Sequence, residues 1–517
     1  MFIDGRALPP DEVLDADLCV IGGGAAGLSL IQGLVGRGLR IVLLESGGQT
    51  DTRSLDHLNS GLSNQPDYPF QATRARGFGG TTARWTGACI PLDPVDFSAR
   101  SWLAHSGWPI SADDLAPFYD AARAIYGLPP AQGEAISGGP FGSGAAHQKT
   151  VWFSNPLNLA DRFRSLVAQD TNIRCVLHAT VTELATHQNG QSVHRARLAF
   201  ENGKSAEVTA KAFVLATGGI ENARLLLNSR DRQPAGLGNA YDTVGRYHME
   251  HPIRAVGTLS LDVNKNAALP FTNRRPTGGT TSEQTFGLSA AVRSREQLLD
   301  LHIRLFRYSP AEAHPAVVAG KALAASPSLP QLGQYVRHHA QHLPVVILPY
   351  VGWHLRNKVW KAAHFDHVRL TAFAEQEPDP ANRITLSSER DAYGLQLPHL
   401  HLRESALMSD SIARSMAILE QDLAKRGIGR LSHDPQRLAH LAHYSKYGLH
   451  QMGATRMSDD PRFGVVDRHL CVHNVNNLFI SGSSVFTTGG AANPTFTISA
   501  LSLRLAAHLL RIIGKVA

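Results

Sequence analysis

Residues 16–45, ADLCVIGGGAAGLSLIQGLVGRGLRIVLLE, carry the clearest structural pattern in the sequence. The short apolar run Ala16–Ile21 predicts a strand, and the glycines after it predict a tight turn. Apolar residues then recur at helical spacing as far as Gly38. A second apolar run, Arg40–Leu44, ends in the acid Glu45. Strand, turn, helix and strand in this order predict the βαβ unit of a dinucleotide-binding fold.

The glycine spacing gives this unit its chemistry. Gly22 would make the turn, Gly24 would let a pyrophosphate approach the backbone, and Gly27 would let helix and strand pack closely. The N-terminus of the helix would offer free N–H groups to the phosphates. Glu45 stands where a ribose hydroxyl would lie, which favours FAD or NAD over NADP.

Length and composition set the outer limits. The chain has 517 residues, whereas one domain has roughly 150, so two or three structural units are expected. With 43% hydrophobic and 18% charged residues, it is globular and not disordered. Its net charge of +7 is spread thinly and has no basic block, so we expect no nucleic-acid partner.

The cysteines and the N-terminus indicate a cytoplasmic setting. Four cysteines lie far apart in the sequence, without the spacing of a disulfide framework or a zinc site. The first residues lack the basic start and apolar run of an export signal. The apolar stretch Leu343–Leu355 is shorter than the roughly 20 residues of a spanning helix, so no membrane span is expected there.

Later segments are predicted to return to the same sheet. Strand-like runs at 181–185, 193–200 and 205–209 are separated by Asn-Gly pairs, which predicts a three-stranded antiparallel meander. The apolar run Ala212–Ala216 predicts a further, parallel strand. Near the C-terminus we expect a strand at Leu478–Ser481 and a long helix at 497–513, packed in the core.

Several longer motifs resemble those of the glucose-methanol-choline (GMC) oxidoreductases. The C-terminal ones are the most specific in order and spacing. The resemblance covers roughly residues 15–110, 175–255 and 370–517. Its motifs are VIGGGAAGLSL near the N-terminus, RARGFGGTTARWTG (Arg74–Gly87), FVLATGGIENARLLL (Phe213–Leu227), VGRYHMEHP (Val244–Pro252), GLHQMGATRMSDDPRFGVVD (Gly448–Asp467) and NLFISGSSVFTTGGAANPTFTISALSLRLA (Asn477–Ala506).

This resemblance implies a fold and a domain organisation. The implied fold class is α/β: a Rossmann-like FAD-binding domain with a parallel sheet and an antiparallel β-meander, plus a discontinuous α+β substrate-binding domain. The FAD-binding domain is expected to comprise residues 1–110, 175–258 and 440–517, and the substrate-binding domain residues 111–174 and 259–439.

The resemblance also implies the site. His450 falls at the family's catalytic histidine and Asn493 at its partner position. A neutral imidazole can take the hydroxyl proton of an alcohol, and the amide can hold the oxygen. The residues expected to bind FAD are Gly22, Gly24, Ala25, Ala26, Gly27, Glu45, Ser46, Gly79, Gly80, Thr81, Thr82, Val181, Thr217, Gly218, Gly482, Ser483, Ser484, Asn493, Pro494 and Thr495.

The resemblance implies FAD-dependent oxidation of a CH–OH group. The motifs are most similar to those of bacterial family members that oxidise sugars, glycosides or polyols. The electron acceptor stays open among O2, a quinone and a redox protein. Two alternatives remain: a redox-silent lyase of the hydroxynitrile lyase type, and a non-enzymatic flavin-binding scaffold.

Three features departed from the motifs or stayed open. In pyranose-oxidase-like relatives a histidine before the loop tryptophan bonds to the flavin; here Arg84 precedes Trp85, which predicts noncovalent FAD. Arg84 was compatible with a place against the flavin ring or on the surface. Histidine groups at 338–342 and 399–401 lack completing ligands, so no metal is expected. Leu343–Leu355, which is followed by Arg356, Lys358 and Lys361, is expected to be a buried helix or loop rather than a docking surface for a membrane or an electron acceptor.

Overall fold

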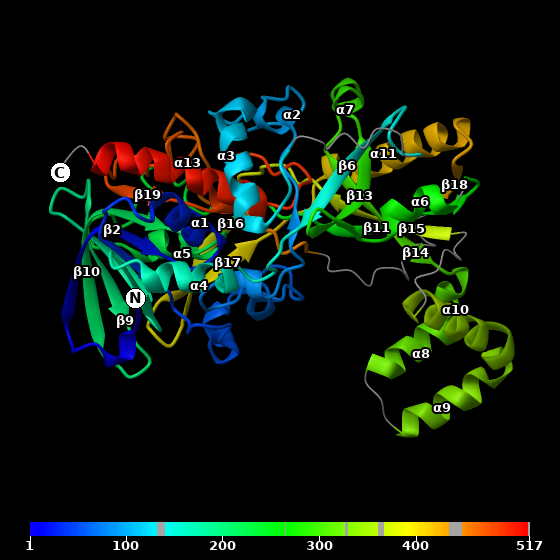
Figure 1. Ribbon diagram of the computed structural model, residues 1–517, viewed down its shortest axis with the longest axis horizontal. Helices are drawn as coiled ribbons and strands as arrows, with labels where there is room; N and C mark the ends of the chain where they lie inside the picture. The colour runs from blue at the N-terminus through cyan, green and yellow to red at the C-terminus, as the bar shows by residue number, and fades with distance from the viewer. Residues whose placement is uncertain (132–139, 264, 326–328, 360–366, 434–446, 515–517) are drawn as a thin grey trace.

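The computed structural model describes residues 1–131, 140–263, 265–325, 329–359, 367–433 and 447–514. The described strands form three sheets. Figure 1 shows the first two sheets towards opposite ends of the molecule's long axis. The first is mostly parallel with an antiparallel meander at one edge, and the second is antiparallel with helices beside it. The predicted fold class is therefore confirmed.

The first sheet is the dinucleotide-type sheet predicted from the opening stretch. Its strands run in the order β1-β7-β3-β2-β10-β9-β8, and β19 also pairs with β10. All pairs are parallel except β10 with β9 and β9 with β8. The strands are β1 (Phe2–Asp4), β2 (Glu12–Ile21), β3 (Ile41–Leu44), β7 (Ile173–Leu177), β8 (Thr180–Thr186), β9 (Val193–Ala199), β10 (Ser205–Leu215) and β19 (Leu478–Ile480).

One strand joins what the sequence predicts as two. The runs at 205–209 and 212–216 are a single strand, β10, because β2 pairs with it continuously from Ala206 to Leu215. On its other side, β10 pairs first with β9 and then with β19. The meander and the parallel sheet are therefore hydrogen-bonded into one layer.

The C-terminal helix α13 (Thr495–Ile513) packs against α1 (Ala25–Leu34) and α3 (Ala112–Tyr126). Ser29 and Ser499 share a hydrogen bond of 2.7 Å, and a Cβ on Gly33 would lie 2.6 Å from the Ala506 Cβ. Among the described helices, α13 has the length and mean hydropathy (1.5) of a membrane span, but 61% of that stretch is buried within the protein. This is the packing expected of a core helix.

The second sheet builds the other half of the molecule. Its order is β18-β11-β15-β14-β13-β6-β5, with β12 paired to β13, and every pair is antiparallel. Its apolar side chains form a second core with those of α11. The strands are β5 (Ala88–Cys89), β6 (Ala146–Phe153), β11 (Ile253–Leu261), β12 (Arg275–Thr277), β13 (Thr280–Leu288), β14 (Leu301–Tyr308), β15 (His367–Ala374) and β18 (Gly429–Ser432).

A small third sheet, β16-β17-β4, and the remaining helices complete the described chain. Three of these helices, α8, α9 and α10, lie apart from the second sheet in Figure 1. The domain boundaries expected from the sequence stay predictions. The elements are β4 (Leu62–Ser63), β16 (Arg383–Arg390), β17 (Gln396–His401), α2 (Pro94–Phe97), α4 (Leu159–Gln169), α5 (Glu221–Asn228), α6 (Lys265–Thr272), α7 (Ala290–Glu296), α8 (Pro315–Ala325), α9 (Leu329–His339), α10 (Leu348–Val359) and α11 (Ala406–Lys425).

Candidate active site

A cavity of about 480 Å³ collects residues from nearly all the predicted motifs. Its lining runs from the turn after β2 to Ile253, Arg304 and Phe373 of the second sheet. Both ends of the chain contribute to it. The predicted site residues that line it are Gly22, Gly24, Ala25, Ala26, Glu45, Ser46, Gly80, Thr81, Thr82, Val181, Thr217, Gly218, His450, Gly482, Ser483, Asn493, Pro494 and Thr495.

Three predicted residues do not line this cavity, and each has a structural contact instead. A Cβ on Gly27 would lie 2.0 Å from the Gly22 carbonyl oxygen, so this glycine permits close packing of helix and strand. The Gly79 N–H donates to the Gly23 carbonyl at 2.9 Å. Ser484 is fully buried, and its hydroxyl accepts a hydrogen bond from the Asn222 amide at 2.9 Å.

The glycine-rich turn leaves space where a phosphate would lie. A Cβ on Gly24 would meet only the Gly80 Cα, at 3.8 Å, so the protein itself does not fill this position. Gly24 is the N-cap of α1, and no side chain caps the first turn. The N–H groups of that turn therefore face the cavity free to bind an anion.

Glu45 is held by the backbone around it. Its Oε2 accepts the Gly23 N–H at 2.9 Å, and its Oε1 accepts those of Gly47 and Gly77 at 2.8 and 2.9 Å. Burial raises the pKa of this carboxyl, and the three N–H groups oppose that rise. The Ser46 hydroxyl also donates to Oε1, at 3.4 Å, so Oε1 accepts three hydrogen bonds. Among the described residues, Oε2 accepts only the Gly23 N–H, so its second lone pair is available to a ribose hydroxyl.

His450 and Asn493 meet at the opposite end of the cavity. Asn493 Nδ2 lies 3.3 Å from His450 Nε2, and the rings of His450 and Phe373 are stacked with centroids 6.2 Å apart. Behind His450, its Nδ1 lies 3.0 Å from Nδ1 of His251. His251 Nε2 in turn lies 2.8 Å from the carbonyl oxygen of Gly490. These four residues form a continuous hydrogen-bonded chain.

The chain fixes where each proton lies. The Gly490 carbonyl only accepts, so His251 Nε2 carries a proton and donates it. In neutral His251, Nδ1 is then an acceptor, so the proton between the two rings belongs to His450 Nδ1. His450 Nε2 is consequently left with its lone pair directed at Asn493, whose amide N–H donates to it. This is the tautomer that a general base requires.

Electrostatics keep both rings neutral. Burial, followed by the neighbouring His251 and His302, holds the pKa of His450 well below its usual range. Burial also lowers the pKa of His251, and it lowers that of His302 to about 3. Among the described residues, no carboxylate is hydrogen-bonded to either ring of the His251–His450 pair. Near neutral pH, His450 is therefore available to receive a proton.

Buried polar groups position the backbone around His450. The His450 N–H donates to Glu250 Oε2 at 3.2 Å, and the Tyr68 hydroxyl donates to Glu250 Oε1 at 2.5 Å. The Gln451 side-chain amide donates to the same Tyr68 hydroxyl at 3.3 Å. Glu250 and His251 are functional neighbours that the sequence analysis did not assign. Their signal was present, because both lie in VGRYHMEHP, a motif used only as a mark of resemblance.

Arg84 has partners that account for its charge. Its guanidinium binds Asp51 at 2.6 and 2.8 Å and Asp56 at 2.9 Å, and it also donates to the Arg74 carbonyl. These carboxylates raise the pKa of Arg84 further above its usual value. Arg84 lines the cavity, but its charge is neutralised by the protein. Arg84 is therefore neither an unpaired charge against the flavin ring nor a free surface arginine, the two places that the sequence left open for it.

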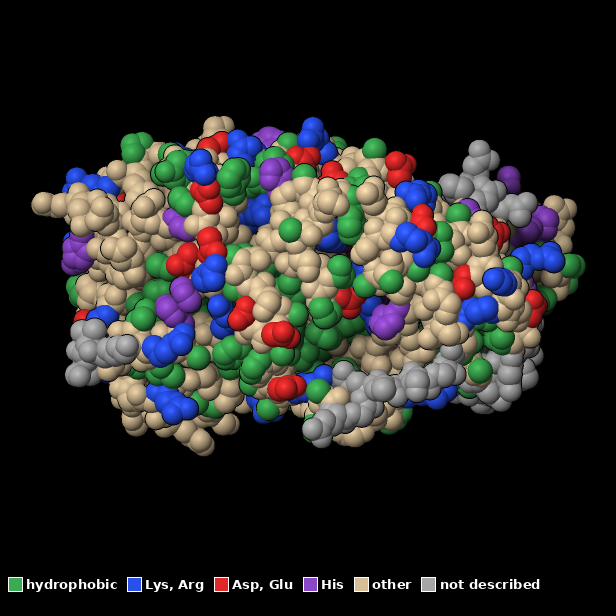
Figure 2. All heavy atoms as spheres, turned by 90° about the horizontal axis from the view of Figure 1, so that it is seen from above, with side chains coloured by type: hydrophobic (Ala, Val, Ile, Leu, Met, Phe, Trp, Pro, Cys, Tyr) green, Lys and Arg blue, Asp and Glu red, His purple; other side chains and the backbone are tan. Residues whose placement is uncertain are grey.

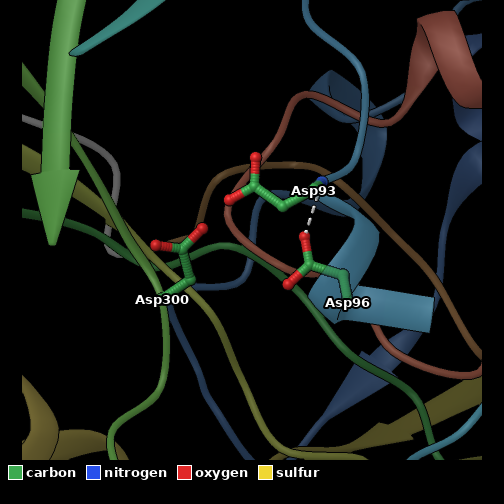
Figure 3. A group of neighbouring side chains, drawn as sticks. All are labelled: Asp93, Asp96 and Asp300. Carbon is green, nitrogen blue, oxygen red and sulfur yellow. Dashed lines mark hydrogen bonds between the residues drawn. The ribbon is translucent and has the colours of Figure 1, made fainter. Parts of the chain in front are cut away.

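Among the described residues, one group of acids has the closeness of a metal site: Asp93, Asp96 and Asp300 (Figure 3). Two cations of the protein already occupy it. Lys149 Nζ lies 2.8 Å from Asp93 and 3.1 Å from Asp300, and Arg293 lies 2.7 Å from Asp93. Burial raises the pKa of Asp96 to about 7, which lowers the negative charge of the group. We interpret it as an internal ion-pair cluster.

The sequence analysis considered a metal site at two groups of histidines. Within each group, the histidine rings lie near one another. His399 and His401 have centroids 4.2 Å apart, and His339 and His342 have centroids 6.2 Å apart. Neither group belongs to the acid cluster described above.

The cavity has a glycine-rich turn with Glu45 at one end, which suits a dinucleotide, and a neutral histidine at the other. These features define a dinucleotide-dependent enzyme. Comparison with known families specifies it. Residues 17–334 match the family model of FAD dependent oxidoreductases, and residues 378–502 match that of the GMC oxidoreductases. The chain belongs to the FAD-dependent oxidoreductases and, among them, to the GMC family. The expectation from the sequence motifs is confirmed.

Its relatives resemble it along nearly their whole length. It is 25% identical to 2-methyl-1,2-propanediol dehydrogenase of Mycolicibacterium austroafricanum, over 96% of this chain and 95% of that one. It is 24% identical to the fructose dehydrogenase large subunit of Gluconobacter japonicus (97% and 98%) and 25% identical to paromamine 6'-oxidase of Streptomyces fradiae (95% and 90%).

Solved structures share the fold. A variant of formate oxidase from Aspergillus oryzae matches with a TM-score of 0.54 at 14% identity, covering 99% of this chain and 100% of that one. Pyridoxine 4-oxidase from Mesorbium loti matches with a TM-score of 0.52 at 16% identity (95% and 98%).

The residues present fit FAD. The uncapped first turn of α1, the space beside Gly24 and the remaining acceptor position of Glu45 suit a pyrophosphate and a ribose. The hydroxyl of Thr180, which also lines the cavity, is buried and has no hydrogen-bond partner in the part of the chain that the structure describes. A second helix N-terminus, that of α13, follows Asn493 and lacks a side-chain cap. It would favour negative charge at the histidine end.

Proposed function

We propose that this protein oxidises a CH–OH group of a sugar, glycoside, aminoglycoside or polyol, with His450 as the general base and Asn493 as the group that holds the substrate oxygen. One observation carries the proposal: the lone pair of the partly buried, neutral His450 Nε2 points to Asn493 in the cavity. The relatives support the substrate class, because they are named for a diol, a sugar and an aminoglycoside.

FAD, when bound, supplies the acceptor for the hydride that leaves the substrate carbon. The protein's own residues handle the proton and the oxygen. His450 Nε2 takes the hydroxyl proton of the substrate. The proton then lies on Nε2, next to the side-chain amide of Asn493. The Asn493 N–H that now points at Nε2 is then free to turn to the substrate oxygen. Such general-base help is worth about 10² to 10⁴ in rate.

His251 prepares His450 for this step. Because His251 Nδ1 accepts the His450 Nδ1 proton, the imidazolium formed in the reaction keeps a partner at Nδ1. Glu250 holds the His450 backbone N–H, and the hydrogen bonds to His251 and Asn493 hold the His450 ring. Positioning of this kind allows a bound substrate to react without reorganising the site.

We also propose that FAD is bound without a covalent link at the loop before Trp85. Arg84 stands there in place of the histidine of pyranose-oxidase-like relatives, and its guanidinium is engaged by Asp51 and Asp56. Acid precipitation tests this: the flavin should appear in the supernatant. Flavin that stays in the pellet would contradict noncovalent binding.

The decisive experiment is an anaerobic titration of the FAD-loaded protein with sugars, glycosides, aminoglycosides and diols, while the visible flavin band is followed. We expect one class to bleach the band. The variant His450→Ala should slow bleaching at least about a hundredfold. The matched control is His187→Ala, which removes an exposed histidine outside the cavity.

Three outcomes would count against the proposal. A loaded flavin that no alcohol bleaches would favour the redox-silent lyase, and bleaching at a normal rate in His450→Ala would exclude this histidine as the base. A protein unable to take up FAD would overturn the whole assignment.

If a substrate does bleach the flavin, the electron acceptor can be identified by reoxidising the bleached protein with O2, a quinone or a redox protein.

A further inference from the structure

The helices α8, α9 and α10 (residues 315–359) have an unusual charge balance. In the sequence from Ala313 to Phe365 there is no Asp or Glu, whereas Lys321, Arg337, Arg356, Lys358 and Lys361 all fall within it. By contrast, the face of the molecule drawn in Figure 2 carries acidic and basic side chains interspersed. This segment is therefore cationic in a protein whose charges are otherwise mixed.

The same helices expose apolar side chains. On α10, Leu348 is 58% exposed, Val351 43% and Leu355 53%. Positions i, i+3 and i+7 lie on one face of a helix, so these three side chains form an apolar stripe directed to solvent. On α9, Leu332 and Val336 are exposed at i and i+4. Val345, between the two helices, is 75% exposed.

This is not the ordinary scatter of surface leucines. The other large apolar side chains exposed in the described part of the chain are spread along it, at Met1, Val13, Leu157, Tyr241, Phe463 and Ile512. A surface helix of a globular protein normally turns its apolar stripe to the core. Here the structure corrects the expectation that Leu343–Leu355 is buried, and clustered exposed apolar side chains mark an interaction site.

Aromatic and basic groups accompany the stripe. The rings of Tyr350 and Trp353 are stacked with centroids 6.0 Å apart. Lys321 Nζ lies 5.3 Å from the Tyr350 ring centroid, but its charge is paired with Glu312 Oε2 at 2.8 Å. The excess of positive charge in the sequence of this segment therefore comes from Arg337, Arg356, Lys358 and Lys361. Apolar side chains on one face, basic residues, and Trp or Tyr are the composition of a helix that lies in the interface of a bilayer. The absence of acids from the segment removes the charges that anionic headgroups would repel.

We propose that α8–α10 form a membrane-docking element that binds the surface of a bilayer containing anionic lipids, with the stripe of α10 inserted among the headgroups. Each buried apolar side chain adds hydrophobic binding free energy, and each basic residue near the surface adds electrostatic attraction. Docking of this kind would bring the enzyme to a bilayer without any helix crossing it. The proposal does not depend on the substrate or on the base.

The test is vesicle flotation of the full-length, FAD-loaded protein. Vesicles of phosphatidylcholine alone are compared with vesicles that also contain phosphatidylglycerol. We expect the protein to float with the anionic vesicles, and less so at high salt, since salt screens the lysines and arginines. The double variant Leu348→Glu with Leu355→Glu should lower the bound fraction at least about tenfold.

Two variants keep the test selective. Leu157→Glu changes an equally exposed leucine outside these helices and should float like the parent protein. Arg337→Gln keeps the apolar stripe and removes one exposed charge, so it should weaken binding to anionic vesicles by about fivefold. Flavin bleaching by substrate in solution should be the same in all of these variants, which shows that they fold.

The proposal fails if the parent protein does not float with anionic vesicles, or if the Leu348/Leu355 double variant floats as well as the parent. Light scattering after size-exclusion chromatography tests the alternative that a second copy of the chain binds the apolar stripe. If the parent is a dimer and the double variant a monomer, the stripe is an interface between two copies of the chain and not a membrane element.

Discussion

The two ends of the cavity are built in opposite ways. At the nucleotide end, one continuous stretch of sequence makes strand, turn and helix, and the backbone itself provides the binding groups. At the histidine end, the chain contributes His251, His450 and the segment Gly490–Asn493 from three separate regions, and the two imidazole rings hydrogen-bond them together. Substitutions at the first end should therefore affect folding and FAD binding, whereas those at the second should affect the rate.

The largest effect is expected at the nucleotide end, from Gly27→Ala. The new Cβ would lie 2.0 Å from the Gly22 carbonyl oxygen, so helix α1 and strand β2 must separate. We expect a loss of about 3 kcal/mol or more in the free energy of unfolding, together with loss of FAD. Thermal unfolding and the flavin absorbance of the purified protein measure the two.

The control for this change is Gly333→Ala on α9, where a Cβ would meet nothing within 4 Å. Alanine there should leave stability unchanged or raise it by up to about 1 kcal/mol, because glycine disfavours helix. If Gly27→Ala behaved like Gly333→Ala, close packing would not be what requires glycine at the turn.

A smaller effect is expected at the histidine end, from His251→Ala. Nδ1 of His450 would lose its acceptor, and the tautomer with a bare Nε2 would no longer be enforced. We expect flavin reduction to slow by about ten- to a hundredfold, with normal FAD content. His251→Asn, whose side-chain oxygen can accept near the same place, should recover part of the rate. Equal loss in both variants would argue against the tautomer mechanism.

The smallest effect is on pH dependence. Because the pKa of His450 lies well below its usual value, the rate of reduction should be level above about pH 6.5 and fall only at more acidic pH. His251 contributes to this lowering, so His251→Ala should move the acidic fall to higher pH. A rate that already falls between pH 8 and 7 in the parent protein would contradict a base that is neutral at pH 7.

The free energy of unfolding should also depend on the protonation of His450 and His251. The folded-state pKa values of His450 and His251 are lowered, so the unfolded chain binds more protons below about pH 6.5. Their contribution to the free energy of unfolding is therefore complete above that pH and is lost as the pH falls. In His251→Ala the slope of the unfolding temperature against pH should be shallower.

The nucleotide end could be predicted from local sequence alone. Spacing of glycines, one acid and two apolar runs predicts a turn whose binding groups are backbone N–H groups, and such local geometry follows from neighbouring residues. The sequence also predicted that His450 and Asn493 belong together, since their motifs matched those of a family. The predicted meander and parallel strand were right, although β10 joins two of the predicted runs because β2 pairs along all of it.

The geometry of the histidine end depends on contacts between residues far apart in the sequence. That His251 stands behind His450, and that the chain of hydrogen bonds ends on the Gly490 carbonyl, depends on contacts between residues about 200 and 240 positions apart. No local pattern encodes such contacts. The apolar stripe of α10 shows the same limit: helical spacing predicts that one face is apolar, but only the packing of the other elements decides whether that face meets a core or solvent.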